Sequence, residues 1–234
     1  MPEAFRGAKD LAQAMCDMSE LESKLEKMRR ELALRTDFNM TDAYKMFNRS
    51  NTFKKGIDCD DFFHALVYGL ELNITKDEMF ILFYKLDKDG DGKLCFSEVC
   101  DCFIPKESEY QSIVNTRGGF YGSETKTSKY FAGPTRQSIK DFFRAYIDVE
   151  VSIELIRQRV FNKLGVKPDL AFNVCDKDKK GYLIMDDMRD FLKSTNMYPS
   201  EKNMQLLYSR FDRDEDQIVT YEEFVTALTP FKEE

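Results

Sequence analysis

The chain repeats its own sequence pattern at an offset of 125 residues. Asp87 corresponds to Asp212 at this offset, and Pro105 corresponds to Pro230. Each half carries two related units of this kind, and 234 residues are enough to bury a core in both halves. The duplication therefore predicts two lobes of similar fold.

A long helical pattern precedes each lobe. Apolar residues recur at spacings of three and four across residues 11–32 and 142–160, which places one apolar stripe along each helix, as in a coiled coil. Such a stripe covers the chain's own lobes or the other stripe, or else it binds a partner helix or filament. We therefore expect an all-α protein. Its expected segments are an N-terminal helix (1–38), lobe 1 (39–105), an irregular linker (106–137), an inter-lobe helix (138–165) and lobe 2 (166–234).

The linker between the lobes has an unusual composition. Its glycines, serines and threonines predict irregular structure. Four aromatic residues, Phe120, Tyr121, Tyr130 and Phe131, are nevertheless unusual for a linker built only for flexibility. We expect this segment to lie against a surface, either of the chain's own lobes or of a partner.

Residues 87–98 have the pattern of a calcium-binding loop. Calcium is a hard cation that takes six to eight oxygen ligands. The segment reads Asp-Lys-Asp-Gly-Asp-Gly-Lys-Leu-Cys-Phe-Ser-Glu, with carboxylates at positions 1, 3, 5 and 12 and a glycine for the sharp turn at position 6. The expected ligands of Ca2+ are Asp87, Asp89, Asp91, the backbone carbonyl of Lys93, and Glu98.

The corresponding segment of lobe 2, residues 212–223, is a second candidate. It departs from the pattern at Gln217, where glycine is expected. A non-glycine residue there must adopt a left-handed conformation at a cost of about 1 kcal/mol, which weakens binding without abolishing it. The expected ligands are Asp212, Asp214, Asp216, the backbone carbonyl of Ile218, and Glu223.

The first loop of lobe 2, residues 176–187, is compromised. Lys180 brings a positive charge to position 5, and Asp187 replaces the closing glutamate with a shorter side chain. Fewer ligand oxygens favour a weak or empty site, or magnesium in place of calcium.

The first loop of lobe 1, residues 51–61, has lost the ligand pattern. Phe53 and Lys55 stand where ligands are expected, so no cation cage can form. We expect a structural role for this loop, in which Ile57 pairs its strand with Leu94 of the intact loop.

These loops resemble those of the calmodulin, troponin C and centrin group of EF-hand proteins, over residues 40–105 and 166–230. The longer arrangement, which includes residues 29–35, 102–105 and 157–160, is similar to calmodulin-like EF-hand proteins of protist ciliary axonemes. This narrower resemblance implies an axonemal component attached to microtubules or to a regulatory complex. Degenerate loops and a long linker depart from calmodulin itself.

Composition narrows the remaining function classes. A net charge of −7 argues against nucleic-acid binding. No apolar run is long enough to span a bilayer, no apolar signal segment begins the sequence, and the six cysteines lack zinc-finger spacing. We therefore expect a cytoplasmic, cytoskeletal location with no membrane partner. His64 is the only histidine and no catalytic motif accompanies it, so we expect no enzyme.

Two functions remain open at this point. A calcium sensor would open its lobes and expose apolar surface to a helical partner. A structural or docking protein would keep each lobe closed. The long striped helices and the aromatic linker favour a calcium-responsive component of an assembly over a freely diffusing sensor.

Overall fold

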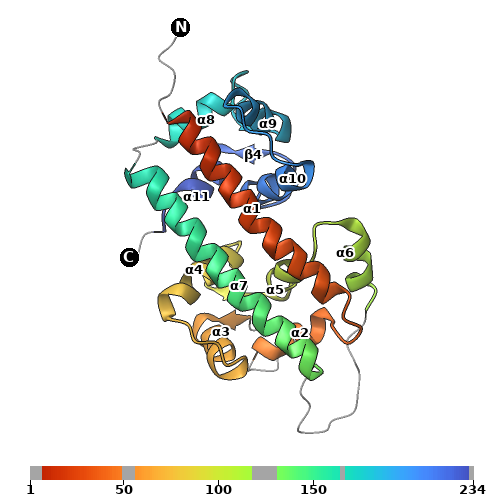
Figure 1. Ribbon diagram of the computed structural model, residues 1–234. Coiled ribbons are helices and arrows are strands. Elements are labelled where there is room, and N and C mark those ends of the chain that lie inside the picture. Colours follow the sequence, from red (N-terminus) through yellow and green to blue (C-terminus); the bar gives the residue numbers. More distant parts are fainter. Residues whose placement is uncertain (1–6, 49–55, 118–130, 164–166, 232–234) are drawn as a thin grey trace. The chain divides into compact units, whose positions relative to one another are not determined.

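Helices make up most of the computed structural model, as the apolar periodicity predicts (Figure 1). The structure describes residues 7–48, 56–117, 131–163 and 167–231. Among the residues described, the regular structure of each lobe is helical apart from one pair of two-residue strands. Within this described part of the chain, no helix combines the length and the apolar character needed to cross a membrane.

Two long helices, α1 (Ala8–Ala33) and α7 (Gly133–Gln158), are each divided between two structural units. The first half of α1 belongs with lobe 2, and the first half of α7 belongs with lobe 1. Each long helix precedes its own lobe in the sequence. This order does not predict that the first half of each helix belongs with the other lobe. The lobe 1 unit is Leu25–Glu150, and the lobe 2 unit combines Met1–Lys24 with Val151–Glu234.

In lobe 1, the strand of the degenerate loop pairs with the strand of the intact loop. Ile57 lies opposite Leu94 in this antiparallel pair, which confirms the predicted pairing. The elements of the lobe 1 unit, besides the halves of α1 and α7, are α2 (Met40–Phe47), β1 (Ile57–Asp58), α3 (Cys59–His64), the π-helical turn η1 (Ala65–Gly69), α4 (Lys76–Leu86), β2 (Lys93–Leu94), α5 (Phe96–Phe103) and α6 (Ser108–Asn115).

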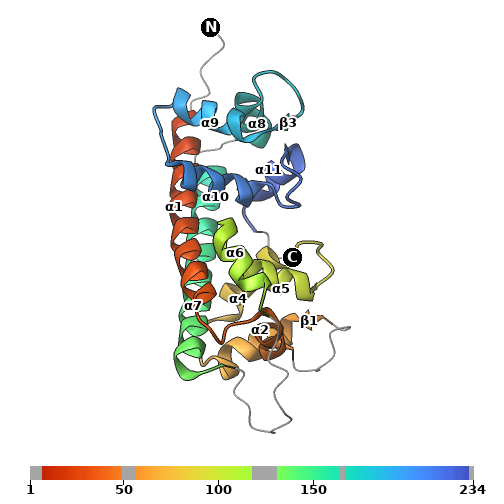
Figure 2. The ribbon, with the colours of Figure 1, turned by 90° about the vertical axis from the view of Figure 1, so that its right-hand side faces the viewer.

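Lobe 2 has the same strand pairing, with Leu183 opposite Val219. Figure 2 shows α8, α9 and β3 gathered at one end of this unit. The elements of the lobe 2 unit, besides the halves of α1 and α7, are the π-helical turn η2 (Arg159–Lys163), α8 (Pro168–Cys175), β3 (Tyr182–Leu183), α9 (Met185–Ser194), α10 (Glu201–Phe211), β4 (Val219–Thr220) and α11 (Tyr221–Leu228).

The apolar stripe of α7 fills the interior of lobe 1. Phe143 is fully buried, and its ring centroid lies 4.9 Å from that of Phe47, 6.1 Å from that of Phe62 and 5.5 Å from that of Phe103. The neighbouring Phe142 also packs on Phe103, at 5.3 Å. The first half of α7 therefore supplies core residues to lobe 1.

The stripe of α1 is buried in the same way in the lobe 2 unit. Leu11, Met15 and Met18 have no exposed surface. Further along the same half of the helix, the carboxylate of Glu22 accepts a hydrogen bond from the guanidinium of Arg210 in α10, and both residues are buried. A buried ion pair fixes the geometry of the contact, because separating the charges would leave one of them unpaired away from water.

The second half of α1 holds the C-terminal end of lobe 1 through a glutamate and an arginine. Nε of Arg29 donates to the carbonyl of Cys102 at 2.9 Å, and Oε1 of Glu26 accepts from the amide of Lys106 at 2.8 Å. Helix α5 ends between these two groups. The carbonyl of Cys102 and the amide of Lys106, which have no partner within the helix, are thus each paired with a side chain of α1.

The second half of α7 makes the same two contacts with lobe 2. We call each such pair of a glutamate and an arginine, together with the backbone groups that they bind, a clasp. Nε of Arg157 donates to the carbonyl of Ala227 at 3.0 Å, and Oε1 of Glu154 accepts from the amide of Phe231 at 3.1 Å. Glu26 and Glu154 are 128 residues apart, whereas the lobes repeat at 125. The duplicated unit therefore includes the long helix as well as the lobe.

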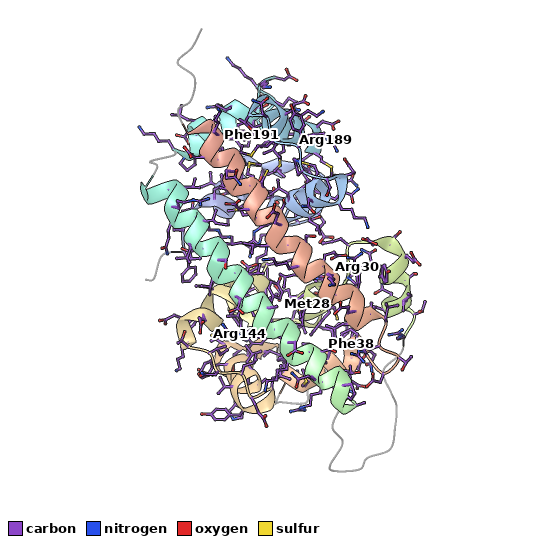
Figure 3. All side chains as sticks on the ribbon, in the orientation of Figure 1. Met28, Arg30, Phe38, Arg144, Arg189 and Phe191 are labelled. Carbon is purple, nitrogen blue, oxygen red and sulfur yellow. The ribbon has the colours of Figure 1, made fainter. Side chains whose placement is uncertain are left out.

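The linker is more ordered than the sequence predicts. Helix α6 occupies residues 108–115, and α7 already begins at Gly133, so the expectation of irregular structure is wrong over these residues. The ring of Phe131 is buried and stacks on Phe38, which Figure 3 labels, at 5.8 Å. Phe120, Tyr121 and Tyr130 lie outside the described residues.

Candidate metal centres

The loop between α4 and α5 brings together three of its predicted ligands. Asp87, Asp89 and Asp91 each offer a carboxylate oxygen, and these oxygens lie within 4.8 Å of one another. Asp87 is buried, whereas the other two residues are exposed. A hard cation that needs several oxygen ligands fits this arrangement.

Backbone amides shape the loop around the first ligand. Oδ1 of Asp87 accepts from the amide of Gly90 at 2.8 Å, and Oδ2 accepts from the amide of Gly92 at 3.0 Å. Both glycines have positive φ, 73° and 79°, which glycine adopts without steric cost. The predicted turn at position 6 is therefore present.

Glu98 joins the two ends of this loop. Its Oε1 accepts from the amide of Lys88 at 2.7 Å, and its Oε2 accepts from the amide of Cys95 at 2.8 Å. The residue is buried in the first turn of α5. An ionised carboxylate has about four lone-pair sites, so each oxygen retains a site for a cation.

The electrostatics of the loop favour a cation. Burial raises the pKa of Asp87 above its usual value, and the negative charges of Glu98 and Asp91 raise it further. Both effects show that the ionised carboxylate is destabilised without a compensating charge. A bound divalent cation would remove this cost, and the donor set of the loop fits Ca2+.

The loop 212–223 has the same construction. Asp212, Asp214 and Asp216 place carboxylate oxygens within 4.8 Å of one another. Oε1 and Oε2 of Glu223 accept from the amides of Arg213 and Thr220, each at 2.9 Å. The three aspartates of the second predicted ligand set are therefore also brought together.

A carboxylate oxygen at the first position of this second loop lacks a hydrogen-bond donor among the described residues. Oδ1 of Asp212 is buried, and no group among the described residues donates a hydrogen bond to it. Burial and the charges of Glu223, Asp216 and Asp214 raise the pKa of Asp212. A buried acceptor without a donor is costly, and a cation bound to this oxygen would satisfy it.

The backbone of the second loop is strained where the sequence predicts it. Gln217 has a φ of 71°, and Glu215 has a φ of 64°. In the first loop, glycines occupy these two positions. The side chains therefore add a conformational cost to the lobe 2 site that the lobe 1 site does not have.

Replacing Gln217 with glycine is expected to strengthen calcium binding at this loop. Relief of about 1 kcal/mol of backbone strain corresponds to roughly a fivefold higher affinity if the calcium-free loop is less ordered than the bound one. Calorimetric titration of the variant measures this change. The variant Gln217→Ala is the matched control, because it removes the same side chain but retains the Cβ, and its affinity is expected to stay near that of the parent chain.

The loop 176–187 does not fit a divalent cation. Nζ of Lys180 lies 2.6 Å from Oδ2 of Asp187, so the residues at positions 5 and 12 are paired with each other. This hydrogen bond raises the pKa of the Lys180 ammonium above its usual value. Asp176 and Asp178 are not part of a three-residue acidic cluster among the described residues.

The degenerate loop of lobe 1 is described only from Gly56 onwards. Phe53 and Lys55, which were expected to exclude a cation, lie outside the described residues. In the described part, Asp58 accepts a hydrogen bond from the amide of Asp61 at 2.8 Å and begins α3. This aspartate acts as a helix cap.

Sequence reasoning located the two clusters of three aspartates and missed the two clasps. The signal was available as a glutamate followed three residues later by an arginine, at 26–29 and again at 154–157. On a helix this spacing places both side chains on one face. Nothing in the spacing shows which backbone groups they would hold.

Comparison with known proteins agrees with this geometry. Residues 54–103 and residues 170–229 each match the family described as an EF-hand domain pair. One segment in each lobe is therefore similar to an EF-hand domain pair, a class of calcium-binding domain.

Three curated relatives share about a quarter of this chain. Calcium-binding protein 7 of Homo sapiens is 35% identical over 60 residues, which is 26% of this chain and 28% of that protein. Calglandulin of Bothrops insularis is 36% identical over 59 residues, 25% of this chain and 38% of that protein. Calcium-binding protein 8 of Homo sapiens is 33% identical over 60 residues, 26% of this chain and 23% of that protein. The matched segment thus spans well under two thirds of each relative.

Proposed function

We propose that this protein is a calcium-responsive component of a cytoskeletal assembly, most closely of the kind found in ciliary axonemes. Its proposed partners are helical or cytoskeletal proteins, microtubules included, and it acts without catalysis. The observation that carries the proposal is the burial of the long helices in the lobes. The axonemal setting rests on the resemblance of the helix, lobe and linker arrangement described above.

The covered lobe interiors support a component rather than a free sensor. A freely diffusing sensor exposes an apolar groove to its target when calcium binds. Here the first half of α7 already fills the interior of lobe 1, with Phe143 and Phe142 fully buried. A target helix would first have to displace part of the chain's own core.

Calcium binding would affect the contacts of the long helices through one short helix in each lobe. Glu98 lies in the first turn of α5, and the carbonyl of Cys102 near the end of the same short helix is held by Arg29 of α1. A cation that moves Glu98 therefore also moves the group that α1 holds. The clasp between Arg157 and Ala227 gives lobe 2 the same route.

A purely structural docking protein is the second candidate. It is favoured by the loss of the ligand set in the loop 176–187, because each lobe then has at most one complete site. In that case calcium would stabilise the lobes without changing how the long helices pack.

Hydrogen exchange of the purified chain, with and without calcium, separates these candidates. For a calcium-responsive component, we expect exchange in α1 and α7 near the clasps to change on calcium addition, while an apolar dye shows little new binding. Strong dye binding would indicate a free sensor. Unchanged exchange in both long helices would indicate the docking protein.

The cytoskeletal part of the proposal needs its own measurement. Co-sedimentation with purified axonemes, in calcium or in chelator, is expected to recover the protein in the pellet and to show a calcium-dependent amount. Absence from the pellet in both conditions would contradict the axonemal assignment and leave calcium binding unaffected.

A further inference from the structure

We propose that the ammonium of Lys180 takes the place of a metal ion in the loop 176–187 and holds this loop in a closed conformation without calcium. The inference concerns a loop that the proposed function does not use. It turns a degenerate site into a permanent structural element of lobe 2.

The first support is the position of the ammonium. Lys180 stands at position 5 of the loop, where the intact loops have a metal-binding aspartate. Its Nζ lies 2.6 Å from Oδ2 of Asp187, the residue at the closing position 12, and 5.4 Å from the ring centroid of Tyr182. An ammonium with three donors can bridge such groups, and an aromatic face adds further attraction.

The second support is the conformation of the backbone. Oδ1 of Asp176 accepts from the amide of Lys180 at 2.9 Å, and its Oδ2 accepts from the amide of Gly181 at 2.7 Å. In all three described loops, the carboxylate at position 1 accepts from the amide at position 6. The loop with Lys180 thus has the same fold as the two loops that fit calcium.

The closing residue also keeps its role at the end of the loop. Oδ2 of Asp187 accepts from the amide of Ile184 at 2.7 Å as well as from Lys180. The glutamates of the intact loops accept from the equivalent amides, those of Cys95 and Thr220. Asp187 is shorter than glutamate, and the long side chain of Lys180 spans the remaining distance.

Closure of the loop 176–187 also fixes the position of the neighbouring loop 212–223. Strand β3 pairs with β4, so Leu183 is fixed opposite Val219 in the calcium loop 212–223. The hydroxyl of Tyr208 donates to the carbonyl of Gln217 at 2.6 Å and lies 3.4 Å from the carbonyl of Leu183. We infer that Lys180 preorganises the remaining calcium site of lobe 2, and so offsets part of the strain at Gln217.

Hydrogen exchange in the calcium-free chain tests the closure directly. Lys180→Met keeps a long, unbranched side chain and removes its charge. We expect the amides of Lys180 and Gly181 to exchange at least about tenfold faster in this variant, because they are protected only while the loop is closed. Lys177→Met, at an exposed position of the same loop, is the matched control and is expected to leave the exchange rates unchanged.

Calcium titration gives a second, independent readout. In the Lys180→Met variant we expect the affinity of the loop 212–223 to fall by about threefold or more, with the number of bound ions unchanged. The double variant Lys180→Asp with Asp187→Glu restores the pattern of carboxylates and is expected to bind one more ion than the parent chain.

Three results would overturn the proposal. The parent chain could bind a divalent cation at 176–187, the Lys180→Met variant could retain full protection of the Gly181 amide, or the double variant could gain no ion. Each of these results leaves calcium binding at the other two loops intact. Failure here is therefore distinguishable from failure of the proposed function.

Discussion

Replacing Glu98 with glutamine is expected to reduce the number of calcium ions that the full chain binds tightly from two to one. The closing glutamate supplies two oxygens to the cation, and the amide offers one oxygen without charge. We expect the affinity of the loop 87–98 to fall by at least about tenfold, or about 1.4 kcal/mol. The fold is expected to persist, because the amide oxygen can still accept one of the two backbone hydrogen bonds that Glu98 accepts. Calorimetric titration measures both the number of ions and their affinity.

Three variants serve as controls for this experiment. Glu223→Gln is expected to remove the other ion, and the double variant is expected to bind neither ion tightly. Lys93→Ala is expected to leave binding nearly unchanged, because position 7 contributes its backbone carbonyl and not its side chain. If Glu98→Gln still bound two ions with the parent affinities, the site in lobe 1 would be wrongly assigned.

Replacing Phe143 with alanine is expected to lower the free energy of unfolding by about 3–5 kcal/mol. This is the usual cost of removing a large aromatic side chain from a packed core, where transfer and cavity effects add. Phe143 is fully buried among the rings of Phe47, Phe62 and Phe103. Chemical denaturation followed by circular dichroism measures the change, with the lobe 1 transition expected to move most.

Leu155→Ala on the same helix is the matched control. Leu155 is 62% exposed, and its removal is expected to change stability by no more than about 0.5 kcal/mol. A small loss of stability in the Phe143 variant, similar to that of the control, would mean that α7 does not pack in lobe 1. The argument against a free sensor would then fail, because the interior of the lobe would be open to a target helix.

These two experiments address separate parts of the function. Loss of a cation without loss of stability would show that the lobes stay folded without calcium. Loss of stability in the Phe143 variant would show that the long helix is part of the lobe. A calcium-responsive component of an assembly requires both results, together with the change in hydrogen exchange described above.

The candidate metal loops could be located from the sequence because all their expected ligands lie within twelve consecutive residues. Local spacing then determines which oxygens can meet, and the structure assembles the three aspartates of each predicted loop. The left-handed conformation of Gln217 followed from the same local reasoning. So did the pairing of Ile57 with Leu94, because paired loops of this kind meet in a short strand.

The partners of the two long helices were decided only by the tertiary structure. Periodicity shows that a helix has an apolar face, but any apolar surface of suitable shape can cover that face. The burial of Phe143 in lobe 1 and of Met15 in the lobe 2 unit depends on contacts between residues far apart in the chain. No local spacing records such contacts.

The same distinction applies to the charged residues. From the sequence, Lys180 is only a lysine at a ligand position, and Arg29 is one of several basic residues on a helix. Tertiary packing places the first against Asp187 and the second against the carbonyl of Cys102. The sequence by itself therefore determined where the candidate calcium loops lie, because their expected ligands are local. Only the tertiary structure decided how each lobe is closed. The partners of long, flexible side chains depend on how the chain packs, and spacing along the sequence does not specify them.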